Sequence, residues 1–191
     1  MNLYLYLTKP EWADAWINGG VVPFYVASKY KSEERTGVLT PDENLIDSST
    51  FDVKSISPGI TFAEGGIARN IRFINCYSNG VVVNGTVNRH YEDGLVICMA
   101  TKKSKYIARK LGKTACVKIN NINKLINCVN EHTGVIGVHG VCTYTATHER
   151  NHFLKSTYDQ WQREYRMFWK GVGNIEVELP PGLGKVEFIL P

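Results

Sequence analysis

The sequence lacks several features that would place it in a special class of protein. No apolar run approaches the length of a membrane-spanning helix, and no internal repeat, low-complexity tract or linker is visible. The first residues hold no basic leader followed by an apolar run, which argues against a signal peptide. The 191 residues are 43% hydrophobic and 21% charged, so we expect one globular domain spanning residues 1–191, without a membrane partner.

Cysteine motifs are also missing. The number of cysteines is odd and no two form a C-x-x-C pair, which argues against a disulfide framework and against a zinc knuckle. We therefore expect free, mostly buried thiols in a reducing compartment, and a cytoplasmic protein. The five cysteines are Cys76, Cys98, Cys116, Cys128 and Cys142.

The charge excess is small. A net charge of +4 permits a nucleic acid or another anionic partner but does not require one. The most basic tract lies within residues 102–113. Such runs usually form the solvated face of a helix, although this one could instead hold cofactor phosphates or an RNA or DNA strand. Its basic residues are Lys102, Lys103, Lys105, Arg109, Lys110 and Lys113.

What is present indicates alternating strands and short helices. In NLYLYLT the three leucines take one face of a strand, while Tyr6 and Thr8 take the other. We expect Thr8 to cap a helix that has Pro10 in its first turn and that ends at Gly19-Gly20. A second strand should follow at residues 21–28.

Further along the chain, residues 29–58 are polar and punctuated, which predicts a long excursion that covers a site. Asn79-Gly80 predicts a hairpin turn between two β-rich runs. Further strands are expected at 94–100, 114–119 and 134–145, and two more at 175–179 and 185–190, around a Pro-Gly turn. A basic helix is expected at 101–113, and a short helix or turn at 121–131. The pattern predicts an α+β fold.

The stretch QWQREYRMFW, residues 160–169, fits either a strand or an amphipathic helix by its periodicity alone. Its aromatic residues and the glycines that follow favour a strand. On a strand, Gln162 and Glu164 point in the same direction, two residues apart. The plainest interpretation is a surface Gln and Glu opposite a buried aromatic face, with Arg166 as a salt-bridge partner.

The segment FLKSTYDQWQREYR resembles a signature of the ADP-ribosyltransferases, enzymes that split NAD, in which Gln-x-Glu opens a late strand. The order of elements is also similar: a first strand, a helix ending in Gly-Gly, the strand VVPFY and a strand that ends near Thr101. The resemblance implies a split β-fold, with mixed or antiparallel sheets and a few peripheral helices. It is strongest with a widespread bacterial group that includes toxins and defence modules.

The resemblance also implies a site. Glu164 is expected to stabilise the oxocarbenium ion that forms as nicotinamide leaves, since a fixed carboxylate favours that cation more than the ground state. Gln162 is expected to orient the acceptor, which could be RNA or DNA, with a protein acceptor left open. An antitoxin partner is expected if the protein is a toxin or antiphage effector. The residues expected to line the NAD pocket are Tyr6, Thr8, Ser28, Tyr30 and Thr101; no metal is implied.

A second hypothesis comes from HERNH, residues 148–152, which matches the H-E-x-x-H pattern of zinc proteases. On a helix, His148 and His152 would share a face and bind zinc, with Glu149 as the base. The β-prone flank TYTAT, the positive charge of Arg150 and the absence of a following third-ligand motif count against it. A zinc-dependent hydrolase is therefore the second hypothesis, and a non-catalytic nucleic-acid-binding module is the third.

Overall fold

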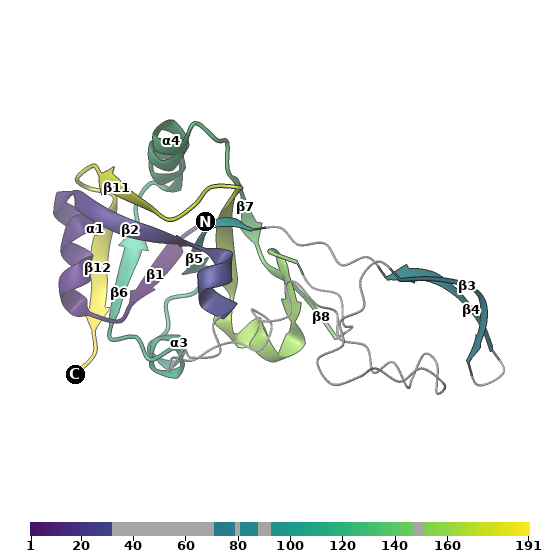
Figure 1. The fold of residues 1–191 in the computed structure, drawn as a ribbon. Coiled ribbons are helices and arrows are strands. Elements are labelled where there is room, and N and C mark those ends of the chain that lie inside the picture. Colours follow the sequence, from purple (N-terminus) through teal and green to yellow (C-terminus); the bar gives the residue numbers. More distant parts are fainter. Residues whose placement is uncertain (32–70, 79–80, 88–92, 147–150) are drawn as a thin grey trace.

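The computed structural model describes residues 1–31, 71–78, 81–87, 93–146 and 151–191 (Figure 1). Most of the polar excursion that we predicted at residues 29–58 lies outside these ranges. All structural statements below concern the described residues, and for residues 71–87 they concern the backbone alone.

Mixed secondary structure with few helices confirms the predicted α+β class. The strands, in chain order, are β1 (Leu3–Leu7), β2 (Gly20–Val26), β3 (Ile71–Ser78), β4 (Val81–Val87), β5 (Gly94–Ala100), β6 (Ala115–Ile119), β7 (Val138–Val141), β8 (Thr143–Thr145), β9 (Leu154–Ser156), β10 (Glu164–Lys170), β11 (Ile175–Leu179) and β12 (Gly184–Ile189). The α-helices are α1 (Asp14–Asn18), α3 (Lys105–Lys110) and α4 (Ile122–Thr133). The 3₁₀ helices are η1 (Pro10–Ala13), η2 (Ala27–Lys31) and η4 (Thr157–Gln162).

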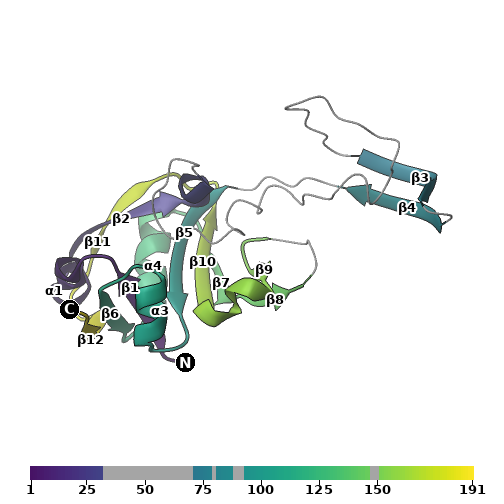
Figure 2. The ribbon, with the colours of Figure 1, turned by 90° about the horizontal axis from the view of Figure 1, so that it is seen from below.

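Eight of the strands form one sheet, in which every described pair is antiparallel. Its main path runs β11-β2-β5-β1-β6-β12, and β10 and then β7 extend it on the other edge of β5. Figure 2 shows β5, β10 and β7 side by side, with β8 and β9 beyond them. The parallel pair β8–β9 and the hairpin β3–β4 form separate two-stranded sheets.

The two faces of β1 enter different cores, as the alternation of NLYLYLT predicts. The leucines pack with α4 and with the aromatic face of β10 in the larger core. The tyrosines Tyr4 and Tyr6 pack against Ile107 and Ala108 of α3 on the opposite face. Helices therefore cover both faces of the sheet, and β5 and β10 lie in its interior because each pairs with other strands along both edges.

The predicted helix after β1 forms, but Thr8 does not cap it. The chain turns into 3₁₀ helix at Pro10, so Lys9 occupies the N-cap position, and it makes no side-chain cap hydrogen bond. Thr8 lies one residue too early; its Oγ1 instead accepts a hydrogen bond from Lys113 Nζ at 2.9 Å. Gly19 ends the helix with φ of 86°, as its position in the Gly-Gly pair predicts.

Most other predicted elements are confirmed, with differences in pairing. The run at 134–145 contains two strands because β7 pairs with β10 whereas β8 pairs with β9. Cys142, between them, donates its N–H to the Glu164 carbonyl at 2.9 Å. The last two strands, β11 and β12, pair with β2 and β6 and not with each other. No disulfide occurs among the cysteines whose side chains are described; Cys116 and Cys142 are buried and Cys98 is exposed.

Candidate functional site

The sheet forks at β5. Along one edge β5 pairs with β10 over its whole length, from Glu164 opposite Ala100 to Lys170 opposite Gly94. The other edge is shared: β2 pairs near the start of β5 and β1 pairs at its end. Among the described strands, none pairs with residues 97–99 on this second edge. The two halves of the sheet therefore separate beside the middle of β5.

A cleft with a volume of about 1090 Å³ lies at this fork. Its walls come from β1, β2, β5 and α1, with residues on either side of them, and its polar side includes three residues at the start of β10 and just before it: Gln162, Glu164 and Arg166. Most of the lining is apolar or aromatic, with Trp12, Trp16, Phe24 and Tyr25 among its residues. A large, mostly apolar cleft with a few converging polar groups is the usual form of a small-molecule site.

Gln162 and Glu164 reach the cleft through a turn and not through a continuous strand. Residues 157–162 form η4, whose first turn is capped by Ser156, and β10 begins only at Glu164. Arg163 between them has φ of 49° and ψ of 49°, a left-handed conformation that is uncommon outside glycine. The strand predicted from residue 160 is therefore wrong for residues 160–163, but the predicted juxtaposition of Gln162 and Glu164 is present.

Hydrogen bonds with two other segments fix this turn. The Arg163 carbonyl accepts from both the N–H of Thr101, at 2.8 Å, and its Oγ1, at 3.1 Å. The Glu164 N–H donates to the Tyr144 hydroxyl at 3.0 Å. Strained backbone that its surroundings hold in place is common at functional sites.

The side chains behind the turn form a buried network of charges. The Lys155 ammonium donates to Gln162 Oε1 and to Glu164 Oε2, both at 2.7 Å. Arg166 Nε donates to Glu164 Oε1 at 2.5 Å, and Gln162 Nε2 donates to Asp159 Oδ1 at 3.1 Å. All five side chains are buried, with Glu164 5% exposed and Gln162 6% exposed. The interpretation of Gln162 and Glu164 as surface residues is therefore wrong, although Arg166 is indeed an ion-pair partner.

The network keeps Glu164 ionised. Burial alone would raise the pKa of its carboxyl, but the charges of Arg166 and Lys155, and their hydrogen bonds, lower that pKa to about 2. The pKa of a nearby neutral group shifts in the opposite direction. Burial, followed by the charge of Glu164, raises the pKa of the Cys142 thiol to about 12. At neutral pH the site therefore contains a fixed carboxylate whose two oxygens are both hydrogen-bonded.

Three of the five residues predicted to contact NAD line the cleft: Tyr6, Thr8 and Tyr30. The Tyr6 hydroxyl is also used structurally, since it donates to the Lys102 carbonyl at 2.6 Å and accepts from the Ser104 N–H at 2.8 Å. Tyr6 is 8% exposed and its ring packs in the core with Phe188, so Tyr6 contributes to the cleft wall from a mostly buried position.

Ser28 and Thr101 are not among the cleft-lining residues. Ser28 donates from Oγ to Asp93 Oδ2 at 2.5 Å, which joins η2 to the start of β5. Thr101 holds the Arg163 turn instead. Its contribution to the site is therefore indirect, because it positions the backbone between Gln162 and Glu164.

The zinc hypothesis gains no support from the described part of HERNH. His148 and Glu149 lie outside the described residues. His152 lies in a turn, and its ring stacks on that of Phe168 with centroids 3.8 Å apart. Its carbonyl accepts a hydrogen bond from Arg166 Nη1 at 3.1 Å. Within the described residues, no three His, Cys, Asp or Glu side chains gather as a metal site would require.

The roles of Lys155 and Asp159 were not predicted from the sequence. A lysine in a polar segment is expected to be exposed, because burying an unpaired ammonium is costly. The available signal was the position of Lys155 in FLKSTYDQWQREYR, seven residues before Gln162 and nine before Glu164. Since η4 folds the chain back, this spacing brings the ammonium to both side chains.

Among the helices of the described segments, none has the length and apolar character needed to cross a membrane. No family model matches the chain, and neither a curated protein nor a solved structure matches it.

Proposed function

We propose that this protein is an NAD-dependent ADP-ribosyltransferase with Glu164 as its catalytic carboxylate and Gln162 beside it. The observation that carries the proposal is the position of an ionised, immobilised glutamate on the wall of a large aromatic cleft where the sheet forks. The forked antiparallel sheet supports the split β-fold that the sequence resemblance implies.

The proposed reaction begins with cleavage of the bond between the nicotinamide nitrogen and the ribose carbon. The electron pair of that bond leaves with nicotinamide and neutralises its ring, while positive charge develops on the ribose. The acceptor then donates a lone pair to the same carbon and loses a proton. A carboxylate fixed beside the ribose stabilises the developing charge without having to reorganise.

The low pKa of Glu164 defines its part in this chemistry. A carboxyl with a pKa of about 2 is ionised at neutral pH, so it cannot act as a proton donor. It is suited to electrostatic stabilisation of a cation. Gln162 retains one amide hydrogen beyond the bond that it donates to Asp159, and this group is available to orient an acceptor.

The cleft suits a dinucleotide. Its volume of about 1090 Å³ is at the upper end of ordinary small-molecule sites. Tyr6, Trp12 and Tyr30 are among its lining residues, and they offer rings on which nicotinamide or adenine could stack. Lys113 and Thr8 at its edge offer donors to a diphosphate.

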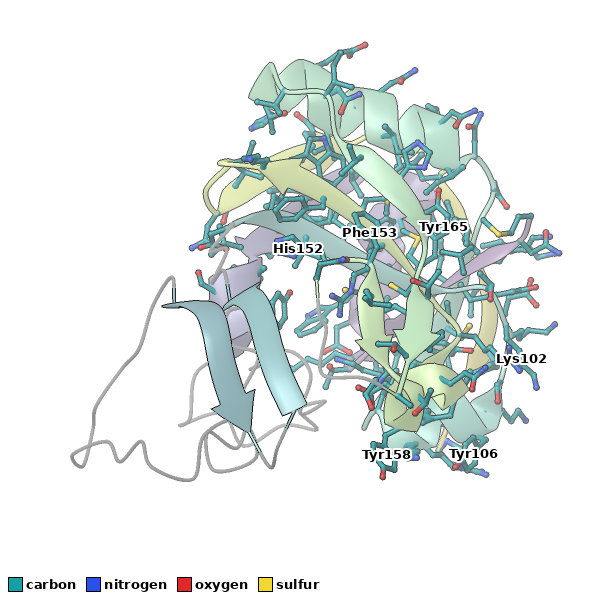
Figure 3. All side chains as sticks on the ribbon, turned by 90° about the vertical axis from the view of Figure 1, so that its right-hand side faces the viewer. Lys102, Tyr106, His152, Phe153, Tyr158 and Tyr165 are labelled. Carbon is teal, nitrogen blue, oxygen red and sulfur yellow. The ribbon has the colours of Figure 1, made fainter. Side chains whose placement is uncertain are left out.

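We favour a nucleic acid as the acceptor because a basic, aromatic surface adjoins the site. Tyr158, 90% exposed, and Trp161 belong to η4, directly before Gln162, while Tyr106, 62% exposed, belongs to α3. Tyr106 and Trp161 meet edge to face at 6.4 Å, with Lys110 Nζ 4.0 Å from the Trp161 ring. Figure 3 shows Tyr106 and Tyr158 at the same end of the molecule. Exposed rings beside lysines are suited to unstacked bases and their phosphates.

The same resemblance leads us to propose that the protein acts in the cytoplasm as a toxin or antiphage effector, kept in check by an antitoxin. A protein acceptor is the alternative outcome of the experiment below.

Incubation with NAD labelled in its adenylate half, together with RNA, DNA and protein in separate reactions, tests the proposal. We expect label in a nucleic-acid fraction, matched by released nicotinamide, and no label with Glu164→Gln. Tyr158→Ala should weaken transfer to nucleic acid without slowing the hydrolysis of NAD, in which water is the acceptor. Salt-sensitive nucleic-acid binding without consumption of NAD would contradict the proposal and favour a non-catalytic binding module.

A further inference from the structure

Lys155 lies at the centre of the buried network, and the proposed reaction assigns it no part. Its side chain belongs to β9 and is 1% exposed. The ammonium lies 2.7 Å from Glu164 Oε2, 2.7 Å from Gln162 Oε1 and 4.0 Å from Asp159 Oδ2. It thus contacts both of the residues that the Gln-x-Glu signature contributes to the site.

The position of Lys155 relative to the cleft decides what it can do. Gln162, Glu164 and Arg166 line the cleft, and Lys155 does not. Its ammonium therefore approaches the carboxylate from the protein interior. Lys155 therefore contacts the carboxylate without lining the cleft, whereas Glu164, 5% exposed, keeps its place in the cleft wall.

Stability alone is a weak reason to bury this lysine. Taking an ammonium out of water costs several kcal/mol, and well-packed apolar residues often replace buried ion pairs at no loss of stability. What apolar residues could not supply is one charged group with hydrogen bonds to two different side chains. Those bonds join the end of η4 to the start of β10 across the strained Arg163.

We propose that Lys155 is a positioning residue of the transferase: its ammonium fixes the Glu164 carboxylate and the Gln162 amide together, in the orientation that faces the cleft. The inference rests on the proposed function. This role also explains the position of Lys155 in FLKSTYDQWQREYR, because from there its ammonium reaches both Gln162 and Glu164.

Several charged or titratable groups surround the carboxylate, and among the described residues two are cations in contact with it. Arg166 on β10 and Lys155 on β9 donate to it, while Asp159 on η4 lies near the ammonium. Cys142 and Tyr144 are neutral neighbours at neutral pH, because burial raises the pKa of each to about 12. Loss of Lys155 would leave Arg166, of the two described cations, at Glu164.

Steady-state kinetics of Lys155→Met and Lys155→Arg, with exposed Lys170→Met as the matched control, test the inference. We expect Lys155→Met to lower kcat about 100-fold with little change in KM for NAD, because the loss concerns orientation and not substrate binding. The acid limb of its pH–rate profile should move up by about one pH unit as Glu164 loses a neighbouring cation. Lys155→Arg should recover part of kcat, and Lys170→Met should match the wild type.

A second measurement needs no turnover. The carbon signal of the Glu164 carboxyl, assigned by its absence in Glu164→Gln, is followed by NMR as a function of pH in the wild type and in Lys155→Met. We expect the carboxyl to titrate at higher pH in the variant. If Lys155→Met does not fold, Lys155→Arg carries the test, with a lower kcat at an unchanged KM.

Two results would overturn the inference in different ways. Unchanged kcat and an unchanged Glu164 titration in Lys155→Met would remove the positioning role while leaving the transferase proposal in place. A wild type that releases no nicotinamide with any acceptor would remove the proposed function, and the inference with it.

Discussion

Arg166 and Glu164 form an ion pair across 2.5 Å in the protein interior, from positions two apart on one strand. Side chains at i and i+2 of a strand share a face, so the spacing in Glu-Tyr-Arg is enough to place them together. Arg166 also donates to the His152 carbonyl at 3.1 Å. The carboxylate is therefore held from β10 itself and, through Lys155, from β9.

Removing the guanidinium should destabilise the fold. Arg166→Met leaves Glu164 buried with one cation in place of two, and breaking a buried pair in this way costs about 3–5 kcal/mol. Urea unfolding at pH 7 measures the loss. The matched change at exposed Arg109, Arg109→Met, should stay within about 0.5 kcal/mol. Equal, small losses in the two variants would mean that the pair contributes little.

Stability should fall with acid in a window that Glu164 sets. Its folded pKa, about 2, lies below the unfolded value of about 4.3. The stability from its ionised form is therefore fully present above about pH 4.3 and is lost as the pH falls toward 2, by about 3 kcal/mol in all. The difference between the unfolding free energies of wild type and Glu164→Gln, followed from pH 7 to 2, isolates this contribution. A difference that stays constant with pH would contradict it.

Tyr6 should matter more to stability than to NAD binding. Tyr6→Phe keeps the ring but removes the hydroxyl that bonds the Lys102 carbonyl and the Ser104 N–H, a loss of about 1–3 kcal/mol. KM for NAD should change little because the ring remains. Tyr4→Phe is the control, because Tyr4 lies on the same face of β1 and its hydroxyl makes no hydrogen bond to the described residues. A large rise in KM with unchanged thermal stability would show that the hydroxyl binds substrate.

Two neighbouring glycines should respond differently to alanine. A Cβ at Gly137 would collide with the ring of Trp169, whose Nε1 donates to Asn130 Oδ1 at 2.7 Å. Gly137→Ala should therefore cost about 1–3 kcal/mol through overpacking at the anchor of β10. A Cβ at Gly140 meets no atom within 4 Å, so Gly140→Ala is the control. Thermal unfolding of both variants decides; equal midpoints would contradict the packing argument.

Local patterns in the sequence were sufficient to predict most strands. The alternation of leucine and tyrosine in β1 places each set in its own core, and Asn121, which accepts from the Lys124 N–H at 3.0 Å, caps the helix expected near 121–131. These features depend on residues close in the chain. The pairing of β11 with β2, and of β12 with β6, depends on long-range contacts that local periodicity does not contain.

The candidate site was predictable in part for the same reason. Gln162 and Glu164 stood out by a short motif, and the structure brings both to one cleft. The conformation that does so was not predictable from periodicity, because it depends on the left-handed Arg163 and on hydrogen bonds from Thr101. The role of Lys155 could not be predicted either, because its burial requires β9 to fold against η4.

Release of nicotinamide from NAD, compared between the wild type and Glu164→Gln in the presence of nucleic acid, tests the central claim most directly. Circular dichroism of both proteins shows whether the variant is folded; if it is not, Glu164→Asp, which keeps the charge but shortens its reach, takes its place. We predict steady release by the wild type and a rate at least about 100-fold lower in the folded variant. Equal rates in the two proteins, or no release by the wild type, would contradict the claim.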